Sequence, residues 1–321
     1  MTILSIDGGG IRGIIPALVL ADLEARTGRR TAELFDLVAG TSTGGILAAA
    51  VAIPGADGRP RHAAADLVAL YLEEGPAIFS RSLGHRIDSA WGVLEEKYDD
   101  DALTAALRRY LGETRASQAL TRVLITAYEL QTRAPYFVKS WRAAEDPSRD
   151  LMLWQAARAT AAAPTYFEPA LVATPGGGPD LSLVDGGVFA TNPSLCAFAE
   201  AARIAPGEPV RIVSLGTGKL TRPIRHADAA GWGLAQWVRP LIDVIFDGSA
   251  DTVDYQLDHL LGAERYHRFQ VVLDRAGGAS DALDDASPGN LQALQDEARR
   301  LIATRAADLD HVAELLLEDA G

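Results

Sequence analysis

Short apolar runs alternate along this chain with longer segments that have the periodicity of helices. Buried strands are predicted from the short runs, which are residues 3–6, 34–39, 121–130, 135–141, 181–184, 210–215 and 267–273. Helices are predicted from the periodic segments, which are residues 14–27, 45–53, 63–74, 99–111, 150–163, 193–203, 231–261, 290–304 and 307–318. Strands joined by helical crossovers form a parallel sheet with helices on both faces. The pattern therefore predicts a three-layer α/β/α fold around a mainly parallel sheet.

Two segments depart from this alternation. Residues 76–98 mix apolar and polar positions, which fits either a lid-like segment or an irregular connection. Residues 274–289 are rich in Gly, Asp, Ala and Ser, and we expect them to form an exposed loop. No linker composition divides the chain, so we expect one domain over residues 1–321, whose mainly helical part from about 225 to 321 packs on the sheet.

The net charge and the cysteine content limit the partners and the cellular compartment that we expect for this protein. The chain has a formal net charge of -13, which argues against a nucleic acid polymer as partner and against adsorption to an anionic membrane by charge alone. The single cysteine, Cys196, forms no intrachain disulfide and fits a reducing cytosol. Residues 46–53 are too short to span a bilayer, and the first residues lack the pattern of a signal peptide. We expect a cytoplasmic protein that meets membranes at most peripherally.

A serine stands where a buried strand is predicted to turn into a helix. Gly40-Thr41-Ser42-Thr43-Gly44 has the pattern G-x-S-x-G, in which the glycines allow a sharp turn and the close approach of a substrate. The N-terminus of the following helix adds a positive partial charge near the hydroxyl. The pattern predicts a nucleophile elbow for acyl transfer, with Ser42 as the nucleophile.

The loop Gly8–Gly13 has two interpretations. Its pattern G-x-G-x-x-G, between a strand and a helix, occurs in dinucleotide-binding enzymes, but the next predicted strand does not end in the acidic residue that binds the ribose. Backbone N–H groups in such a loop also suit an oxyanion hole. We favour the oxyanion hole, with Gly8, Gly9 and Gly10 as donors and Arg12 either steadying the loop or meeting an anionic group of the substrate.

A serine hydroxyl needs a base that accepts its proton. The chain has histidines at 62, 85, 226, 259, 267 and 311, and none stands at a predicted strand end beside small residues. Asp185 does follow a predicted strand and precedes Gly186 and Gly187, so its carboxylate is expected at the sheet edge that carries Ser42. An ordinary Asp-Gly turn explains these residues equally well, and spacing alone leaves the choice open.

Together these motifs resemble those of the patatin-like phospholipases. The similar stretches are Asp7–Gly13, Gly40–Gly44, Ala162–Phe167, Asp185–Gly187 and Asn192-Pro193, within about residues 3–218. The resemblance implies a Ser–Asp dyad of Ser42 and Asp185 without histidine, an oxyanion hole in the Gly8–Gly10 loop with Arg12, and no metal or cofactor. It also implies hydrolysis of fatty acyl esters of phospholipids or related glycerolipids at a membrane surface.

The resemblance adds hypotheses about regulation and leaves alternatives. Bacterial members of this family also act as antiphage effectors that cyclic nucleotides activate, and this compact chain is similar to them. A cyclic dinucleotide is therefore a candidate activator, and a homo-oligomer a candidate assembly. The alternatives are a nucleotide-binding α/β enzyme that uses the Gly8–Gly13 loop and a catalytically silent lipid-binding or storage protein. Intact Ser42 and Asp185 argue against the silent protein.

One apolar stripe falls in the C-terminal part. Trp232, Trp237, Leu241, Ile245 and Phe246 are spaced as one face of a helix. We expect this stripe to be a core face. Docking on a lipid surface is the alternative, and it predicts that an aspartate in place of Trp237 weakens vesicle binding but spares hydrolysis of a soluble ester.

Overall fold

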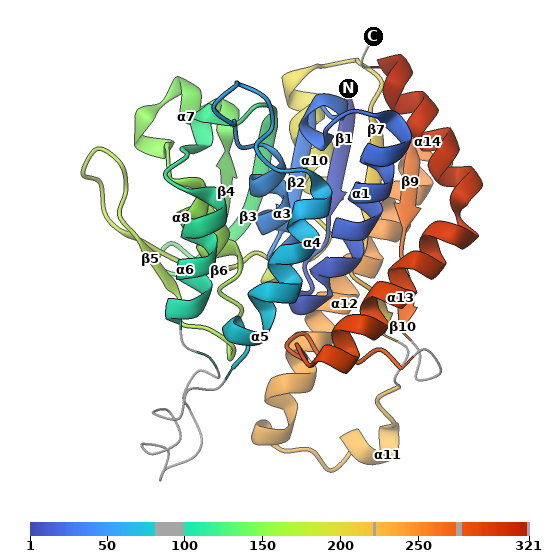
Figure 1. Ribbon diagram of the computed structural model, residues 1–321. Coiled ribbons are helices and arrows are strands. Elements are labelled where there is room, and N and C mark those ends of the chain that lie inside the picture. Colours follow the sequence, from blue (N-terminus) through green and yellow to red (C-terminus); the bar gives the residue numbers. More distant parts are fainter. Residues whose placement is uncertain (81–97, 99, 221–222, 274–277, 320–321) are drawn as a thin grey trace.

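The computed structural model describes residues 1–80, 98, 100–220, 223–273 and 278–319. An eight-stranded sheet lies at their centre in the order β5-β6-β3-β2-β1-β7-β9, with β4 beside β3 (Figure 1). Its strands are β1 (Thr2–Ile6), β2 (Leu37–Thr41), β3 (Arg122–Glu129), β4 (Ala134–Lys139), β5 (Ala170–Val172), β6 (Leu181–Asp185), β7 (Arg211–Leu215) and β9 (Tyr266–Phe269). Two short strands, β8 (Lys219–Leu220) and β10 (Val272–Leu273), pair separately.

The sheet is parallel in one half and antiparallel at the other edge. Strands β1, β2, β3, β7 and β9 run parallel. Strands β4 and β6 run antiparallel to β3, and β5 runs antiparallel to β6. A hairpin joins β3 to β4, and Arg133 takes a φ of 54° in its turn. A connection this short allows only antiparallel pairing.

Helices cover both faces of the sheet, which confirms the predicted fold class. The helices are α1 (Ile14–Thr27), α2 (Thr31–Leu34), α3 (Thr43–Val51), α4 (Ala64–Glu73), α5 (Gly75–Ile78), α6 (Asp100–Leu111), α7 (Ser140–Glu145), α8 (Leu153–Thr160), α9 (Gly187–Ala190), α10 (Ser194–Ile204), α11 (His226–Ala229), α12 (Leu234–Leu261), α13 (Pro288–Thr304) and α14 (Ala306–Asp319). Within the described residues, none of them is both long and apolar enough to cross a bilayer.

Alternate side chains of the strands enter two hydrophobic clusters. Leu4 and Val38 belong to the larger cluster, with α1, α3, α4, α8, α13 and α14. Ile3 and Leu37 point to the other face and pack with α10 and the C-terminal half of α12. Because successive side chains of a strand alternate between faces, short strands of this kind need apolar residues at every position.

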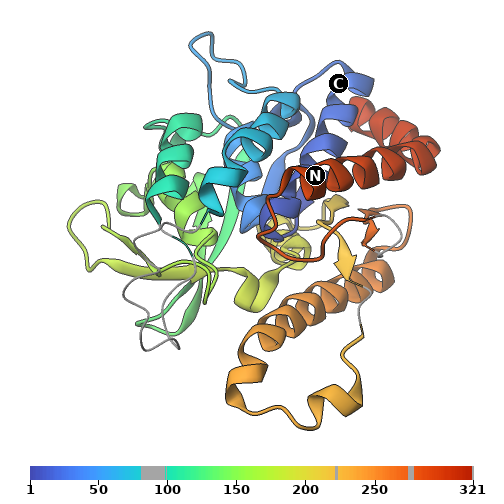
Figure 2. The same ribbon diagram turned by 60° about the horizontal axis from the view of Figure 1, so that its bottom comes forward.

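The expectation that the stripe on α12 is a core face is wrong for most of its residues. Trp237, Leu241 and Ile245 are 36%, 47% and 40% exposed, whereas Phe246 is buried. The reason is the position of the helix: α11 and the first half of α12 project beyond the layers that cover the sheet (Figure 2). The segment is helical as its periodicity predicts, but Phe246 faces the cavity and not the exposed side. Only the tertiary arrangement decides what each side of the helix packs against.

The region after β7 differs from the predictions in two further respects. The single strand predicted over 267–273 is two strands, β9 and β10, which pair with β7 and β8 respectively. The segment 278–289 is mostly half-buried rather than exposed, and Leu283 is only 9% exposed. Its carbonyl accepts the Ile11 N–H at 2.8 Å. The segment 76–98, which fitted either a lid-like segment or an irregular connection, lies largely outside the described residues.

A glycine-to-alanine pair tests the packing of α3 on the sheet. A Cβ at Gly44 would lie 2.2 Å from the Ile6 carbonyl oxygen, so Gly44→Ala should lower the free energy of unfolding by about 2 kcal/mol or more. Gly248, in α12, has nothing within 4 Å of its Cβ position, so Gly248→Ala should raise it by up to about 1 kcal/mol. Chemical denaturation measures both. Equal midpoints for Gly44→Ala and the wild type would contradict this account.

Candidate active site

Ser42 occupies a strained turn between β2 and α3. Its backbone has φ 55° and ψ -125°, a conformation that non-glycine residues seldom adopt. Its N–H donates to Thr160 Oγ1 at 2.8 Å. A Cβ at Gly40 would lie 2.1 Å from the Gly44 carbonyl oxygen, and one at Gly8 would lie 3.2 Å from Ser42 Cβ. The two glycines of the pentapeptide are thus required by close backbone contact, and Gly8 leaves room beside the serine.

The two threonines of the pentapeptide hold the turn from either side. Thr41 Oγ1 donates to the Ala190 carbonyl at 2.6 Å and lies 2.7 Å from Thr126 Oγ1. Thr43 Oγ1 lies 2.5 Å from the Tyr71 hydroxyl. Both threonine hydroxyls are therefore engaged in hydrogen bonds within the fold, although Thr43, like Ser42, lines the cavity described below.

The sheet brings Asp185 to the same edge as Ser42. Strand β3 pairs Thr126 with Thr41, the residue before Ser42, and pairs the next residue, Ala127, with Asp185. Asp185 is completely buried at the end of β6. The register of β3 thus places the predicted serine and carboxylate side by side, although they are far apart in the sequence.

The environment of Asp185 raises its pKa. Burial is the largest cause, and it outweighs the opposing effects of the Ser42 hydroxyl and the Gly187 N–H, so the pKa rises to about 7. Oδ1 accepts the Gly187 N–H at 2.7 Å, while Oδ2 has no hydrogen-bond partner within 3.5 Å among the described residues. A carboxylate with this pKa can exchange a proton near neutral pH.

The two glycines after Asp185 permit close packing. A Cβ at Gly186 would lie 2.1 Å from Thr126 Oγ1, and one at Gly187 would lie 2.8 Å from the Phe246 ring. Neither position has space for a side chain. The stretch Asp185–Gly187 therefore requires glycines for steric reasons, and the Gly187 N–H also donates to Asp185.

The glycine loop lies against Ser42 and offers two backbone donors. Gly8 donates its N–H to the Thr191 carbonyl at 2.9 Å and accepts from Thr217 Oγ1 at 2.6 Å. The prediction that Gly8 is an oxyanion donor therefore needs correction, because its N–H is engaged within the fold. Among the described residues, the N–H groups of Gly9 and Gly10 have no hydrogen-bond partner, and both residues line the cavity.

Arg12 supports the loop from behind. It is 5% exposed, its Nε donates to the Gly9 carbonyl at 3.3 Å, and its guanidinium also reaches the Asp281 carbonyl at 3.5 Å. It is not among the residues that line the cavity. Of the two predicted roles of Arg12, the geometry favours steadying the loop over contacting a substrate.

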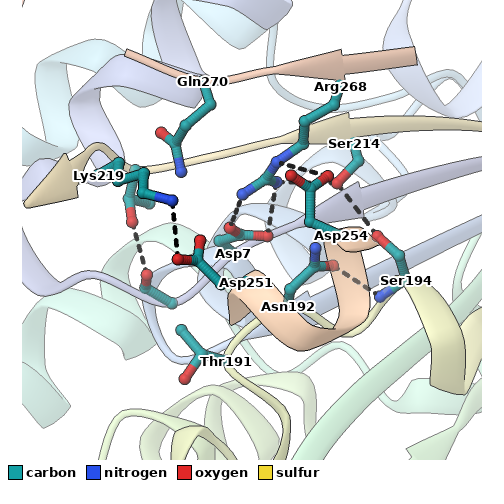
Figure 3. Close-up of polar contacts among 12 residues, drawn as sticks. Asp7, Thr191, Asn192, Ser194, Ser214, Lys219, Asp251, Asp254, Arg268 and Gln270 are labelled. Atoms are coloured by element: carbon teal, nitrogen blue, oxygen red, sulfur yellow. Dashed lines mark hydrogen bonds and ion pairs between the residues drawn. The ribbon is translucent and has the colours of Figure 1, made fainter. Parts of the chain in front are cut away.

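A buried ion pair anchors the start of the loop, and the sequence analysis missed its cationic partner. Arg268 of β9 donates to Asp7 through two nitrogens, at 3.0 Å to Oδ1 and 2.5 Å to Oδ2, and to Ser214 Oγ at 2.9 Å (Figure 3). A bidentate pair of this kind fixes orientation as well as charge. The signal in the sequence was Asp7 itself, since a carboxylate at the end of a buried strand requires a partner.

A narrow apolar cavity of about 70 Å³ opens onto Ser42 and Asp185. Its walls are mostly aliphatic and aromatic, and come from Gly9, Gly10, Ile11, Thr43, Ile46, Leu70, Tyr71, Gly75, Ile78, Phe79, Leu103, Ala161, Ala163, Tyr166, Phe167, Phe246 and Leu283. Phe246 and Leu283 belong to the C-terminal part, so that part completes the cavity. Within the described residues, no histidine lines it.

The described residues also hold no cluster of three or more His, Cys, Asp or Glu suited to a metal ion. His62, His259 and His267 are engaged elsewhere: His62 with the Tyr110 carbonyl, His259 with the Tyr255 carbonyl, and His267 beside His311. His85 lies outside the described residues. Among the described residues, Asp185 is the buried carboxylate that lines the cavity with Ser42.

Comparison with known proteins gives the family. The family model for patatin-like phospholipase matches residues 4–197, which include Ser42, Asp185 and the glycine loop. The chain belongs to the patatin-like phospholipase family. The predicted family relationship is thus confirmed, and all the stretches from which it was predicted except Asn192-Pro193 contribute residues to the cavity.

Plant members of the family are similar over nearly the whole chain. "Probable inactive patatin-3-Kuras 1" of Solanum tuberosum is 35% identical over 97% of this chain and 88% of its own length. "Patatin-like protein 4" of Arabidopsis thaliana is 33% identical over 95% and 84%. "Patatin-T5" of Solanum tuberosum is 34% identical over 92% and 81%. The similarity extends beyond the family model into the C-terminal part, which completes the cavity.

Ionisation of Asp185 should lower the free energy of unfolding as the pH rises. Its pKa is raised in the fold, so the neutral form is favoured there, and stability falls as the pH rises from about 4 through about 7. Asp185→Asn keeps the acceptor for the Gly187 N–H and cannot ionise. Its melting temperature should match that of the wild type at pH 4.5 and exceed it by several degrees at pH 8, as measured by calorimetry.

Glu208→Gln is the control for loss of one negative charge, because Glu208 is exposed in the loop before β7. It should show no comparable gain between pH 4.5 and pH 8. A difference between Asp185→Asn and the wild type that is the same at both pH values would contradict the raised pKa of Asp185.

Proposed function

We propose that this protein is a lipid acyl hydrolase that cleaves fatty acyl ester bonds of phospholipids or related glycerolipids. One observation carries the proposal: Ser42, Asp185, Gly9 and Gly10 line the same apolar cavity, and the N–H groups of the two glycines have no hydrogen-bond partner among the described residues. Nucleophile, base and oxyanion donors are the parts that acyl transfer requires. The cavity supplies an apolar environment for the carbons of a fatty acyl chain that lie next to the ester.

In the proposed reaction Asp185 takes the proton of the Ser42 hydroxyl as Ser42 Oγ attacks the ester carbonyl carbon. The negative charge that develops on the carbonyl oxygen is stabilised by the N–H groups of Gly9 and Gly10, each worth roughly 3–4 kcal/mol. Collapse of this intermediate breaks the ester bond, and the proton on Asp185 passes to the departing alcohol. Asp185 then activates water, which hydrolyses the acyl-enzyme.

A free aspartate has a pKa of roughly 3.9 and is therefore a poor base for a hydroxyl. Burial makes Asp185 a better base because it raises the pKa of its carboxyl. A pKa of about 7 brings Asp185 close to the pH at which the enzyme would work. The same burial excludes water, which strengthens the electrostatic effect of the loop on the oxyanion. A dyad without histidine is therefore chemically sufficient in this site.

The substrate proposal follows from the walls of the cavity. Ile46, Leu70, Ile78, Phe167 and Phe246 offer no partner to a charged or hydrogen-bonding head group. An acyl chain suits these walls, and the head group would remain outside. The nucleotide-binding alternative is less well supported, since the loop faces this apolar space and a nucleotide phosphate would compete with the serine beside it.

The catalytically silent alternative is compatible with one relative, whose own name describes it as probably inactive. Against it, this chain retains both members of the dyad and holds them in one cavity. A strained φ at Ser42 is costly to maintain, by about 1–3 kcal/mol, which favours a role for the serine hydroxyl in chemistry. Activation by a cyclic dinucleotide remains a hypothesis from the resemblance alone.

The dyad is tested by activity and by labelling. Ser42→Ala and Asp185→Asn should each lower kcat/KM for a p-nitrophenyl acyl ester and for phosphatidylcholine by about a thousandfold or more. A fluorophosphonate probe should label the wild type at Ser42, as mapped by mass spectrometry, and should not label Ser42→Ala. Substantial hydrolysis by Asp185→Asn, or labelling at another serine, would contradict the proposed roles.

The pH dependence tests the assignment of Asp185 as the base. The carboxylate must be ionised to take the proton, so kcat/KM should rise about tenfold per pH unit below pH 7 and level off above it. The measurement uses a soluble ester between pH 5 and 8.5, where the wild type remains folded by circular dichroism. A flat profile over this range would argue that Asp185 is not the group that titrates.

A further inference from the structure

The first half of α12 carries an exposed apolar stripe. It consists of Trp237, Leu241, Val244 and Ile245, which are 36%, 47%, 46% and 40% exposed. Their spacing of three and four residues places them on one side of the helix. The chain has a net charge of -13, and an exposed apolar stripe on such a chain indicates a surface that binds a partner.

The other side of the same helix forms part of the cavity. Phe246 directly follows Ile245, is 6% exposed and lines the cavity together with Ser42 and Asp185. The exposed stripe and the cavity wall therefore lie on opposite sides of the same two turns of α12. A surface that covers the stripe would also lie beside the site.

The half of α12 that carries the stripe lies at the end of the molecule that holds the cavity (Figure 1). Figures 1 and 2 show α11 and the first turns of α12 projecting from the end where α5 lies, and Gly75 and Ile78 of α5 line the cavity. Trp232, just before α12, packs edge-on against Trp237, with ring centroids 5.1 Å apart. Indole rings favour the boundary between lipid and water, because they combine an apolar body with a polar N–H.

We propose that this stripe docks the protein on the surface of a zwitterionic lipid bilayer and so brings the bilayer to the cavity. This inference rests on the proposed lipid acyl hydrolase. The acidic net charge selects against an anionic surface, where it would be repelled. Four side chains that are each about half exposed or less form a patch well below the roughly 800 Å² per partner of a stable protein dimer.

The test compares one substitution at two places on α12. Leu241→Asp introduces a negative charge into the stripe. Leu260→Asp introduces the same charge near the other end of the helix, where Leu260 is 59% exposed. Neither leucine lines the cavity. Flotation with phosphatidylcholine vesicles measures binding of the full chain, and hydrolysis of p-nitrophenyl butyrate measures the site without a membrane.

Leu241→Asp should reduce the fraction bound to vesicles about fivefold or more and leave p-nitrophenyl butyrate hydrolysis within twofold of the wild type. Leu260→Asp should change neither quantity. The proposal is overturned if the wild type does not bind the vesicles, if both variants lose binding equally, or if Leu241→Asp loses ester hydrolysis in parallel with binding. A stripe that joins two copies of the chain would instead show Leu241→Asp shifting a dimer to a monomer in sedimentation, with vesicle binding unchanged.

The two proposals fail in different ways. If the wild type hydrolyses the soluble ester but does not bind vesicles, the docking surface is wrong and the acyl hydrolase stands. If the wild type binds vesicles through Leu241 but hydrolyses neither ester nor phospholipid, the docking surface stands and the proposed activity is wrong.

Discussion

The close backbone contact at Ser42 is the constraint on which the rest of the site depends. Helix α3 begins so near β1 and β2 that Gly40 and Gly44 have no room for a Cβ, and Ser42 is held at a φ of 55°. This packing presents the serine hydroxyl at the carboxyl end of β2, beside the end of β1. The apolar core beneath α3 maintains the strain, because the surrounding helix and strands leave the turn no alternative.

The remaining parts of the site reach Ser42 through the register of the sheet. Strand β3 aligns Asp185 next to the serine, and the burial that follows raises the pKa of the carboxyl to about 7. The same burial lowers stability as the carboxylate ionises, so the property that would make Asp185 a useful base also works against the fold. The glycine loop is held by Thr191 and Thr217, and Asp7 ahead of it by Arg268, so its donors are oriented before any substrate arrives.

The C-terminal part belongs to the site. Arg268 anchors the residue before the loop, Leu283 lies over Gly10, and Phe246 closes one wall of the cavity. These contacts link the cavity to the exposed half of α12, which gives the docking proposal its physical basis. The similarity to plant relatives also continues past the limit of the family model at residue 197.

Local signals in the sequence determined the elements, the G-x-S-x-G turn and the glycine loop, because short-range sterics and periodicity decide them. Spacing alone did not decide whether Asp185 is a catalytic base or an ordinary turn residue. The family resemblance favoured the base, and the register of β3 explains why Asp185 lies next to Ser42. The engaged N–H of Gly8, the ion pair of Arg268 and the half-buried loop 278–289 depend on partners distant in the chain, so no local pattern could show them. The sequence alone predicted the helical stripe on α12, but only the tertiary structure decided that it is exposed. The reason is that the period of apolar residues specifies one face of a helix but not what that face packs against.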